Sequence, residues 1–355
     1  MLATDNMFDI TPTESSRLSQ IDFDNIPFGR VFSDHMFSME YRDGKWHKGE
    51  IVPFQNLSMN PASSVIHYGQ SIFEGMKAFR HENGKVSLFR PEKNIERFNI
   101  SAQRMCMPEV DPQTFMEALD QLIGMDADWV PNDPSGALYV RPFMFATDEY
   151  IGVKPSETYK FMIFTCPVGK YYSGAVKVKI ETRFARSAAG GTGYAKAAGN
   201  YAGALYPAKL AQEEGYQQLI WTDAKEHKYI EESGTMNVMF KTGNTLITAP
   251  VSETILDGIT RDSVLTLAKS WGYEVQERPI PFTEILDLAK EGKLDEAFGV
   301  GTAATIAPIA VIGYEGVDFE LKDHNTWEFG TRVSKAMDGI KRGTEEDKFN
   351  WNHFV

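Results

Sequence analysis

The sequence predicts an α+β protein that is divided into two domains, with mostly antiparallel sheets. At 355 residues the chain is longer than one ordinary core supports, and 42% of its residues are hydrophobic. Turn signals typical of β-hairpins recur along the chain, and helix patterns stand between the strands. We expect a smaller N-terminal α+β domain over 1–168, a small, polar linker over 169–175, and a larger C-terminal domain over 176–355.

The first half of the chain reads as antiparallel strands followed by two helices. An Asp-Gly pair at 43–44 and an Asn-Gly pair at 83–84 accept the positive φ angles of tight hairpin turns. We expect one helix from about Pro91, through KNIERFNISAQRM, and a second over 112–125 with Asp111 as its N-cap. The runs ALYVRPFMFA and YKFMIFTCPV predict two further strands.

The second half predicts another sheet and a helix. The segment VKVKIET alternates with period two, and QQLIWTDA and YIEESGTMNVMF continue the sheet. A Gly-Asn pair at 243–244 turns the chain back into TLITAP. We expect a helix that begins near Gly258 and stops at Gly272, with Leu265 and Trp271 on its apolar face.

Charge and cysteine content narrow the class of function. The formal net charge is −13, and an acidic protein is repelled by nucleic acid and by anionic membranes. Cys106 and Cys166 lie far apart in the chain, which indicates a reducing compartment and no disulfide framework. The N-terminal segment lacks the basic and apolar parts of a signal peptide, and no apolar run approaches about 18 residues. We expect a soluble, cytoplasmic enzyme that acts on small molecules and binds neither nucleic acid nor membrane.

Lys196 is the most informative residue. It is the only charged side chain between Arg186 and Lys209, within the small-residue run GGTGYAKAAGNYAGAL. A lysine among Gly and Ala is a candidate for partial desolvation, which lowers the pKa and leaves a nucleophilic amine suited to a Schiff base. The alternative is a surface lysine that extends from a glycine-rich loop into solvent.

Glu231 and Glu232 stand at the end of a predicted strand, directly before Ser-Gly-Thr-Met-Asn. Adjacent residues of a strand point to opposite faces, so we expect one acid in solvent and the other inside. An inward carboxylate needs a partner. A protonated ring nitrogen and a buried arginine are both open at this point.

Two small-residue turns could hold a phosphate. The segment LDGITR at 256–261 puts a glycine, a hydroxyl and a basic residue at the start of a predicted helix, where backbone N–H groups and the helix dipole attract anions. Ordinary capping by Asp257 or Thr260 is the alternative. The turn GVGTAA at 299–304 matches a dinucleotide fingerprint, but only about 55 residues follow, too few for a nucleotide domain.

These observations describe one kind of cofactor site. The seven histidines show no metal-ligand spacing, so we expect no metal. A solitary lysine, an inward acid and two phosphate-type turns together indicate a site for pyridoxal 5′-phosphate.

The chain resembles the fold-type IV pyridoxal-phosphate enzymes, whose two-domain fold is that of D-amino acid aminotransferase. It is most similar to the branched-chain amino acid aminotransferases of the longer type shared by eukaryotes and some bacteria. The resemblance covers nearly the whole chain, in the ordered blocks PFGRVFSDHMF, VIHYGQSIFEGMKAFR, SLFRPEKNIERF, LYVRPFMF, CPVGKYY, GYAKAAGNY, EESGTMNVMF, LDGITR and GVGTAATIAP. It implies reversible transamination of L-leucine, L-isoleucine and L-valine with 2-oxoglutarate, to give branched-chain 2-oxo acids and L-glutamate.

The resemblance also assigns cofactor roles. Lys196 would bind the cofactor covalently and move the proton at the substrate α-carbon. Glu232 would pair with the pyridine nitrogen, and Tyr201 would hydrogen-bond the O3′ atom. The phosphate would be held by Arg97, the backbone amides of Ile259 and Thr260, and the hydroxyl of Thr302.

Substrate roles follow from the same resemblance. The walls of the aliphatic pocket would be Phe28, Phe73, Tyr139 and Thr235, and the amides of Thr302 and Ala303 would hold the α-carboxylate. Tyr68, Ile151 and Val153 match positions that the neighbouring subunit contributes, which implies a homodimer. Tyr171 would lie in the linker over the pocket. Arg141, two residues after Tyr139 on the same strand face, resembles the arginine that recognises the glutamate side chain.

Some alternatives and departures stay open. Each apolar pocket residue could instead be core, and Arg97 could be a surface arginine paired with Glu92 or Glu96. Mammalian relatives carry a C-x-x-C pair where this chain has Ala304 and Ala307, so we expect no thiol regulation. D-amino acid transamination, aminodeoxychorismate lyase action and a non-catalytic cofactor carrier are the competing functions.

Overall fold

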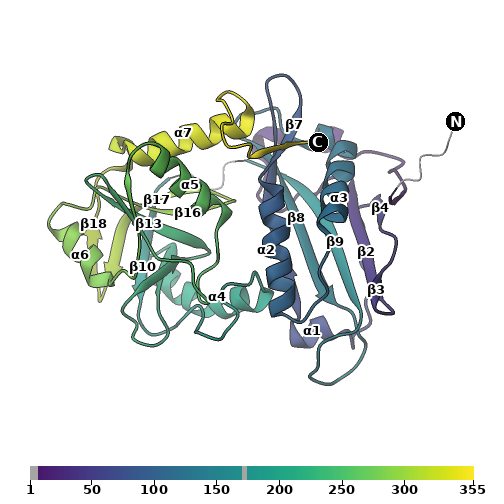
Figure 1. The fold of residues 1–355 in the computed structure, drawn as a ribbon, viewed down its shortest axis with the longest axis horizontal. Coiled ribbons are helices and arrows are strands. Elements are labelled where there is room, and N and C mark those ends of the chain that lie inside the picture. The colour runs from purple at the N-terminus through teal and green to yellow at the C-terminus, as the bar shows by residue number, and fades with distance from the viewer. Residues whose placement is uncertain (1–6, 170–173) are drawn as a thin grey trace. The chain divides into compact units, whose positions relative to one another are not determined.

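The computed structural model describes residues 7–169 and 174–355, which belong to two compact units (Figure 1). The first comprises Met1–Tyr171, Ala195–Gly199 and Gly339–Val355, and the second Tyr172–Tyr194 and Asn200–Asp338. The expected linker lies largely outside the described residues. The sequence-based division places both the Lys196 segment and the C-terminal residues in the second domain, but their contacts are with the first unit, because each supplies backbone partners to its strands.

The first unit is built on a mainly antiparallel sheet. Its strands are β1 (Asp9–Ile10), β2 (His35–Arg42), β3 (Lys45–Trp46), β4 (Glu50–Pro53), β5 (Ser71–Phe73), β6 (Met76–Arg80), β7 (Val86–Phe89), β8 (Ala137–Ala146), β9 (Tyr159–Val168) and β19 (Asn352–Phe354). They follow the order β1-β4-β2-β9-β8-β6-β7-β19, with β3 joined to β2 and β5 to β8. The two predicted long strands, β8 and β9, are confirmed and pair along their whole length.

Helices α2 (Pro91–Arg104) and α3 (Pro112–Met125) cover one face of this sheet. The short helix α1 (Ser64–Tyr68) packs through Val65 against Met36, Phe145 and Met162, which belong to the other face. Figure 1 shows α2 and α3 beside each other over β8, β9 and β2. Phe98 of α2 and Phe115 and Leu119 of α3 are fully buried, and each such side chain contributes about 1.5–3 kcal/mol. The Asp111 carboxylate accepts a hydrogen bond from the Thr114 amide at 2.8 Å, which confirms the predicted N-cap.

The second unit contains a sheet that closes on itself. Its strands are β10 (Val176–Glu181), β11 (Gln218–Thr222), β12 (Ile230–Ser233), β13 (Met236–Thr242), β14 (Thr245–Thr248), β15 (Glu274–Glu277), β16 (Glu296–Gly301), β17 (Thr305–Tyr314) and β18 (Val317–Glu320). Strand β12 pairs with both β11 and β13, so β12, β11, β10, β17, β16 and β13 form a ring. Parallel pairing joins β10 to β11 and β17, and β14 to β15, an exception to the antiparallel expectation.

The turn at 299–304 joins β16 to β17 as an antiparallel hairpin. A dinucleotide-binding fingerprint requires a strand, a turn and then a helix. The sequence-based rejection of a nucleotide domain at this turn is therefore confirmed.

The remaining helices are α4 (Ala198–Glu213), α5 (Ile259–Ser270), α6 (Phe282–Lys290) and α7 (Phe329–Arg342). The prediction of α5 is confirmed, with Gly272 at φ +82° just beyond its end. Helix α4 escaped sequence analysis because its small residues and the internal Pro207 leave no clear apolar stripe.

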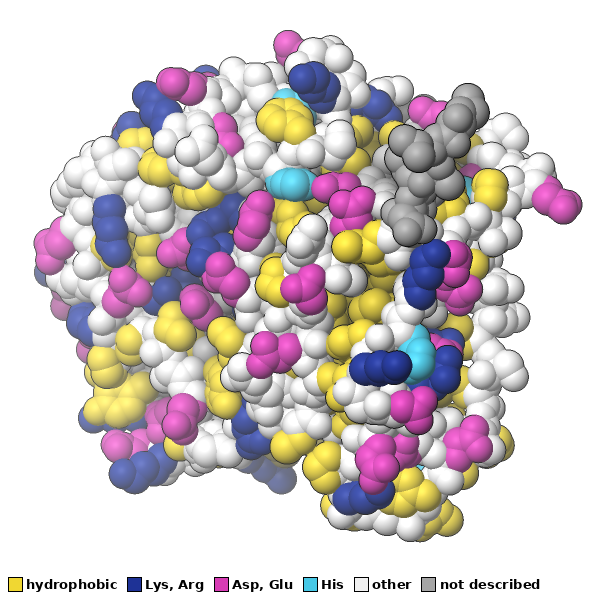
Figure 2. Space-filling model, turned by 45° about the vertical axis from the view of Figure 1, so that its right-hand side comes forward, with side chains coloured by type: hydrophobic (Ala, Val, Ile, Leu, Met, Phe, Trp, Pro, Cys, Tyr) yellow, Lys and Arg dark blue, Asp and Glu magenta, His cyan; other side chains and the backbone are white. Residues whose placement is uncertain are grey.

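Among the described residues, no helix is both long and apolar enough to span a bilayer. Acidic and basic side chains are interspersed over the face shown in Figure 2, with exposed apolar atoms between them.

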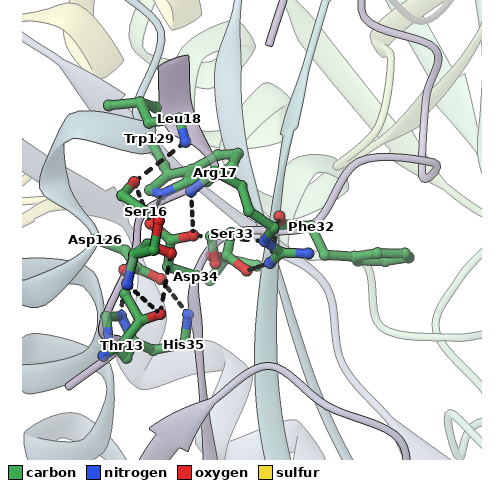
Figure 3. Close-up of polar contacts among 12 residues, drawn as sticks. Thr13, Ser16, Arg17, Leu18, Phe32, Ser33, Asp34, His35, Asp126 and Trp129 are labelled. Atoms are coloured by element: carbon green, nitrogen blue, oxygen red, sulfur yellow. Dashed lines mark hydrogen bonds and ion pairs between the residues drawn. The ribbon is translucent and has the colours of Figure 1, made fainter. Parts of the chain in front are cut away.

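Asp34 fixes the segment 13–18 to the start of β2 (Figure 3). Its buried carboxylate accepts hydrogen bonds from the Ser16 hydroxyl at 2.5 Å, the Arg17 amide at 3.0 Å and the Trp129 indole at 3.0 Å. Burial by itself raises the pKa of this carboxyl, but the three donors outweigh it and leave the pKa below its ordinary value.

The neighbouring residue extends the network. His35 Nδ1 lies 2.7 Å from an oxygen of Asp126, and its Nε2 faces the Thr13 amide at 2.9 Å. Because the amide can only donate, Nε2 accepts, and the proton of a neutral ring lies on Nδ1. Asp34, just before β2, and His35, its first residue, thus hold the segment 13–17 in place (Figure 3).

We predict that Asp34→Asn lowers the free energy of unfolding at neutral pH by about 1–3 kcal/mol, because an amide oxygen cannot replace a carboxylate that accepts three donors. The folded-state pKa lies below the unfolded value of about 3.8. The stabilisation is therefore present above that value and is lost as the pH falls through the folded-state pKa. Thermal unfolding across this range measures the effect, with the exposed Asp128→Asn as control. A deficit that persists undiminished in acid would contradict the prediction.

Candidate active site

Lys196 is held by the first unit through its backbone. Its N–H donates to the Ser101 hydroxyl at 2.9 Å, and its C=O accepts from the Phe73 amide at 3.1 Å. Ile72 and Ala197 form an isolated β-bridge beside these bonds. The half-buried side chain places Nζ 5.0 Å from the centroid of the Phe73 ring. The lysine is thus a fixed residue on a strand edge, not a member of a loose loop.

Arg97 is buried and paired with Glu74. Its Nε donates to Glu74 Oε1 at 2.7 Å and its Nη2 to Oε2 at 2.8 Å, a two-point contact of planar groups. Asn94 Nδ2 adds a third bond to Oε2 at 2.7 Å. The alternative of a surface arginine is wrong, since Glu96 pairs with Lys93 on the exposed side of α2.

Glu74 is the acid that sequence reasoning missed. Its side chain is fully buried, and burial by itself raises a carboxyl pKa. The guanidinium of Arg97, the ammonium of Lys196 and the Asn94 amide outweigh that effect and leave the pKa of Glu74 lowered. The only signal in the sequence is an acid at the end of an apolar strand, which by itself names no partner.

Arg141 and Tyr139 lie on one face of β8, as predicted. Arg141 Nη2 donates to the Tyr139 hydroxyl at 2.9 Å, and its guanidinium carbon lies 4.7 Å from the Phe73 ring centroid. Phe28 packs edge-on against Tyr139, with ring centroids 5.7 Å apart. Within the described structure, Arg141 Nε is buried without a hydrogen-bond partner. The structure therefore brings four predicted substrate residues together beside Lys196 in the first unit.

Three further predicted residues of this unit are exposed to solvent. Tyr68 is 44% exposed, Ile151 88% and Val153 92%. Such exposure of large apolar side chains is the reverse of a core role. Tyr171 lies outside the described residues.

In the second unit the carboxylate of Glu232 forms an ion pair with Arg186. Arg186 Nε lies 2.9 Å from Glu232 Oε2, and the Leu256 amide donates to Oε1 at 2.7 Å. Arg186 Nη2 also donates to the carbonyl oxygens of Gly193 and Thr254, at 2.9 Å each. The sequence left a ring nitrogen and a buried arginine as possible partners of the inward acid, and the structure contains the arginine. This ion pair joins β12 to the loops on either side of it.

The burial of Glu231 contradicts the expectation that one of the two adjacent acids lies in solvent. Alternation placed one of the two acids in solvent, yet Glu231 is only 7% exposed and Glu232 3%. The reason is that every residue of β12 is buried, inside a closed ring and under the loop that carries Thr254. The Thr254 hydroxyl donates to Glu231 Oε1, whereas Oε2 has no partner among the described residues.

Burial changes the pKa of the Glu231 carboxyl. Burial raises the pKa of its carboxyl, and the charges of Glu232 and Asp223 add to this. The Thr254 hydroxyl and Arg186 oppose the shift without cancelling it. Glu231 therefore holds its proton more readily than an exposed glutamate does.

The predicted phosphate turn begins α5. Its N-cap is Gly258, and a Cβ atom there would collide with the side-chain oxygen of Asn237. Asn237 Nδ2 in turn donates to the Leu256 carbonyl at 2.9 Å. Ile259 and Thr260 are the first residues of the helix, where amide groups and the dipole favour an anion.

The other predicted residues of the second unit occupy two turns between strands and the start of α4. Strand register puts Asn237 opposite both Glu232 and Val300, so the start of β13 lies between β12 and the end of β16. Thr235 occupies the β12–β13 turn, and Thr302 and Ala303 the β16–β17 turn. Tyr201 lies half-buried in the first turn of α4. Across the described ranges, no three His, Cys, Asp or Glu side chains could share a metal ion.

Comparison with known proteins places the chain in a family. The family described as Amino-transferase class IV matches residues 71–312. The chain belongs to this family. It is 44% identical over 341 residues to branched-chain-amino-acid aminotransferase 2 of Bacillus subtilis, covering 95% of this chain and 94% of the relative. It is 41% identical to branched-chain-amino-acid transaminase 1 of the same organism, over 93% of this chain and 94% of the relative.

Solved structures agree with this assignment. The crystal structure of the Escherichia coli branched-chain amino acid aminotransferase matches with a TM-score of 0.75 and 26% identity, over 90% of this chain and 98% of that chain. The Thermobaculum terrenum enzyme, solved in a PLP form, matches with a TM-score of 0.74 at 22% identity over 90% and 98%. The α+β, fold-type IV class expected from the sequence is confirmed.

We predict that Glu231→Gln becomes progressively more stable relative to the wild type as the pH rises from about 4.5, the ordinary carboxyl pKa. A raised folded-state pKa means that ionisation of Glu231 costs stability above the unfolded value. The amide resembles the protonated acid and avoids this cost. Thermal unfolding over the pH range measures the difference, with exposed Glu226→Gln as control. A constant difference between Glu231→Gln and wild type would refute the raised pKa.

Proposed function

We propose that the chain is a pyridoxal 5′-phosphate-dependent branched-chain amino acid aminotransferase. It transfers the amino group reversibly between L-leucine, L-isoleucine or L-valine and 2-oxoglutarate, which gives branched-chain 2-oxo acids and L-glutamate. The observation that carries the proposal is Lys196, whose N–H and C=O are both bonded to the scaffold, next to the buried Glu74–Arg97 pair. The family and the names of its relatives set the reaction class.

The residues fit the cofactor. Lys196 offers an amine, Glu232 a buried carboxylate for a ring nitrogen, and Arg97 a guanidinium for a phosphate. Gly258 is the N-cap of α5, where a Cβ would collide with Asn237, and the first backbone amides of this helix favour an anion. When bound, the cofactor supplies an electron sink for the electrons released at the substrate α-carbon.

The protein side chains then have separate tasks. Lys196 would hold the cofactor covalently and, once released, would carry the proton to and from the substrate α-carbon. Glu232 would keep a ring nitrogen protonated, and Arg186 with the Leu256 amide orients that carboxylate. Tyr201 would donate to the O3′ atom. Arg97, Ile259, Thr260 and Thr302 would hold the phosphate.

Substrate selection rests on aromatic walls with one buried cation. Phe28, Phe73 and Tyr139 supply apolar surface for an aliphatic side chain, and Thr235 completes the wall. The amides of Thr302 and Ala303 bind the α-carboxylate. Arg141 Nε, buried without an acceptor of its own, suits the γ-carboxylate of glutamate.

We also propose a homodimer in the cytoplasm. Ile151 and Val153 are almost fully exposed in one chain, which favours cover by a second copy. Cys106 and Cys166 are both free, which suits a reducing compartment.

Lys196→Ala tests the assignment directly. We expect the purified variant to lose the visible absorbance of bound cofactor and all turnover, because no other amine occupies that position. Absorption spectra and a coupled assay over L- and D-amino acids with 2-oxoglutarate measure both effects. Lys209→Ala, an exposed lysine of α4, should behave as wild type. A borohydride-stable cofactor adduct retained in Lys196→Ala would exclude Lys196, and turnover of D-amino acids by the wild type would favour the competing chemistry.

Arg141→Met tests specificity. A charge-assisted hydrogen bond is worth roughly 1.5–3 kcal/mol, so the glutamate half-reaction should slow about 10- to 100-fold in kcat/KM. The leucine half-reaction should fall much less, since an aliphatic side chain makes no bond to Arg141. Single-turnover mixing with each amino acid separates the two, with exposed Arg42→Met as control. Proportional losses for both substrates would show that Arg141 supports the site without selecting its substrate.

The double variant Ile151→Asp/Val153→Asp tests the dimer. Two charges on a surface that a partner must desolvate should shift the sedimentation of the protein to that of a monomer. The control Val317→Asp alters an exposed apolar residue of β18 and should leave the dimer intact. A wild-type chain that sediments as a monomer would end the proposal.

A further inference from the structure

Both carboxylate oxygens of Glu74 accept hydrogen bonds, and not all of these bonds come from the charged Arg97. Its Oε1 accepts from Arg97 Nε, while its Oε2 accepts from Arg97 Nη2, from Asn94 Nδ2 and from the Gly75 amide at 3.1 Å. The side chain is 0% exposed and that of Arg97 9%. Taking a carboxylate and a guanidinium out of water costs several kcal/mol per ion, so such a pair is weak support for stability by itself.

The same acid is connected to the lysine by two routes. Glu74 follows Phe73, whose amide binds the Lys196 carbonyl at 3.1 Å. From the other side, the Ser101 hydroxyl donates to the Arg97 carbonyl at 2.9 Å and accepts from the Lys196 amide at 2.9 Å. Arg97 and Lys196 are therefore both tied to the strand end that carries Glu74.

Two-point pairing fixes the plane of a guanidinium. Arg97 has five N–H donors, and those on Nε and Nη2 meet Glu74 along one edge. A glutamine in place of Glu74 would offer one acceptor and would turn an N–H group toward a cation. The guanidinium would then lose its fixed orientation while keeping its charge.

We propose that Glu74 is a positioning residue that orients Arg97 toward the phosphate of pyridoxal 5′-phosphate. This inference rests on the proposed function, in which Arg97 binds that phosphate. In this role Glu74 acts through Arg97, with which it shares two hydrogen bonds. The lowered pKa of Glu74 agrees with a carboxylate that stays ionised throughout the working pH range.

The experiment compares two ligands that differ only in the phosphate group. Dissociation constants of pyridoxal 5′-phosphate and of pyridoxal are measured by fluorescence quenching of the full-length protein freed of cofactor. Glu74→Gln should weaken binding of the phosphorylated ligand about 10- to 100-fold, which corresponds to one charge-assisted hydrogen bond. Pyridoxal should change less than about 3-fold, because the fold itself persists.

Two further variants serve as comparisons for this result. Arg97→Met should show the same selective loss, and adding Glu74→Gln to it should cause no further loss. Glu296→Gln is the structural control, since Glu296 is another buried carboxylate that accepts the amides of Phe329 and Gly330 at the start of α7. It should lower the melting temperature and leave the ratio of the two dissociation constants unchanged.

The possible outcomes are distinct. Equal binding of the two ligands by Arg97→Met would overturn the phosphate role of Arg97 and thus that part of the proposed function. A selective loss in Arg97→Met together with an unselective change, or none, in Glu74→Gln would overturn the positioning role alone. If Glu74→Gln does not fold, Glu74→Asp decides. It retains the charge on a shorter side chain and must still shift the ratio of the two constants, and a wild-type ratio would refute the proposal.

Discussion

Burial of charge is the constraint on which the candidate site depends. Each unit contains a carboxylate–arginine pair almost out of reach of water, Glu74 with Arg97 and Glu232 with Arg186. A buried ion whose partner is removed costs about 3–5 kcal/mol, so each pair ties its neighbouring segments to one geometry. Through Arg97 and Ser101 that geometry reaches the Lys196 backbone, and through Arg186 it reaches the loops beside β12.

Much of the fold could be predicted from sequence patterns that extend over only a few residues. Helices α2, α3 and α5 were identified because caps, prolines and glycine stops are chemical signals within a few residues. Strands β8 and β9 followed from their apolar runs. Helix α4 was missed because its small residues form no amphipathic pattern, whereas α6 and α7 were missed although each has one.

The partners of the buried side chains could not be predicted, because they lie far apart in the sequence. Lys196 and Glu232 were recognised because their sequence surroundings are unusual and match a known family. Glu74 and Arg97 are 23 residues apart, and Glu231 is buried by a loop from further along the chain. Period-two alternation describes a strand with one wet face, and β12 has none.

The first unit is discontinuous in sequence, and this has a consequence for synthesis. Its strand β7 pairs with β19, whose last residue is Phe354, and its lysine segment arrives only at Ala195. Domains usually fold as units during translation, the N-terminal one first. Here residues 352–354 must be synthesised before the edge of the first sheet is complete. Until then β7 presents unpaired backbone groups at the edge of the sheet, where another chain could pair with it.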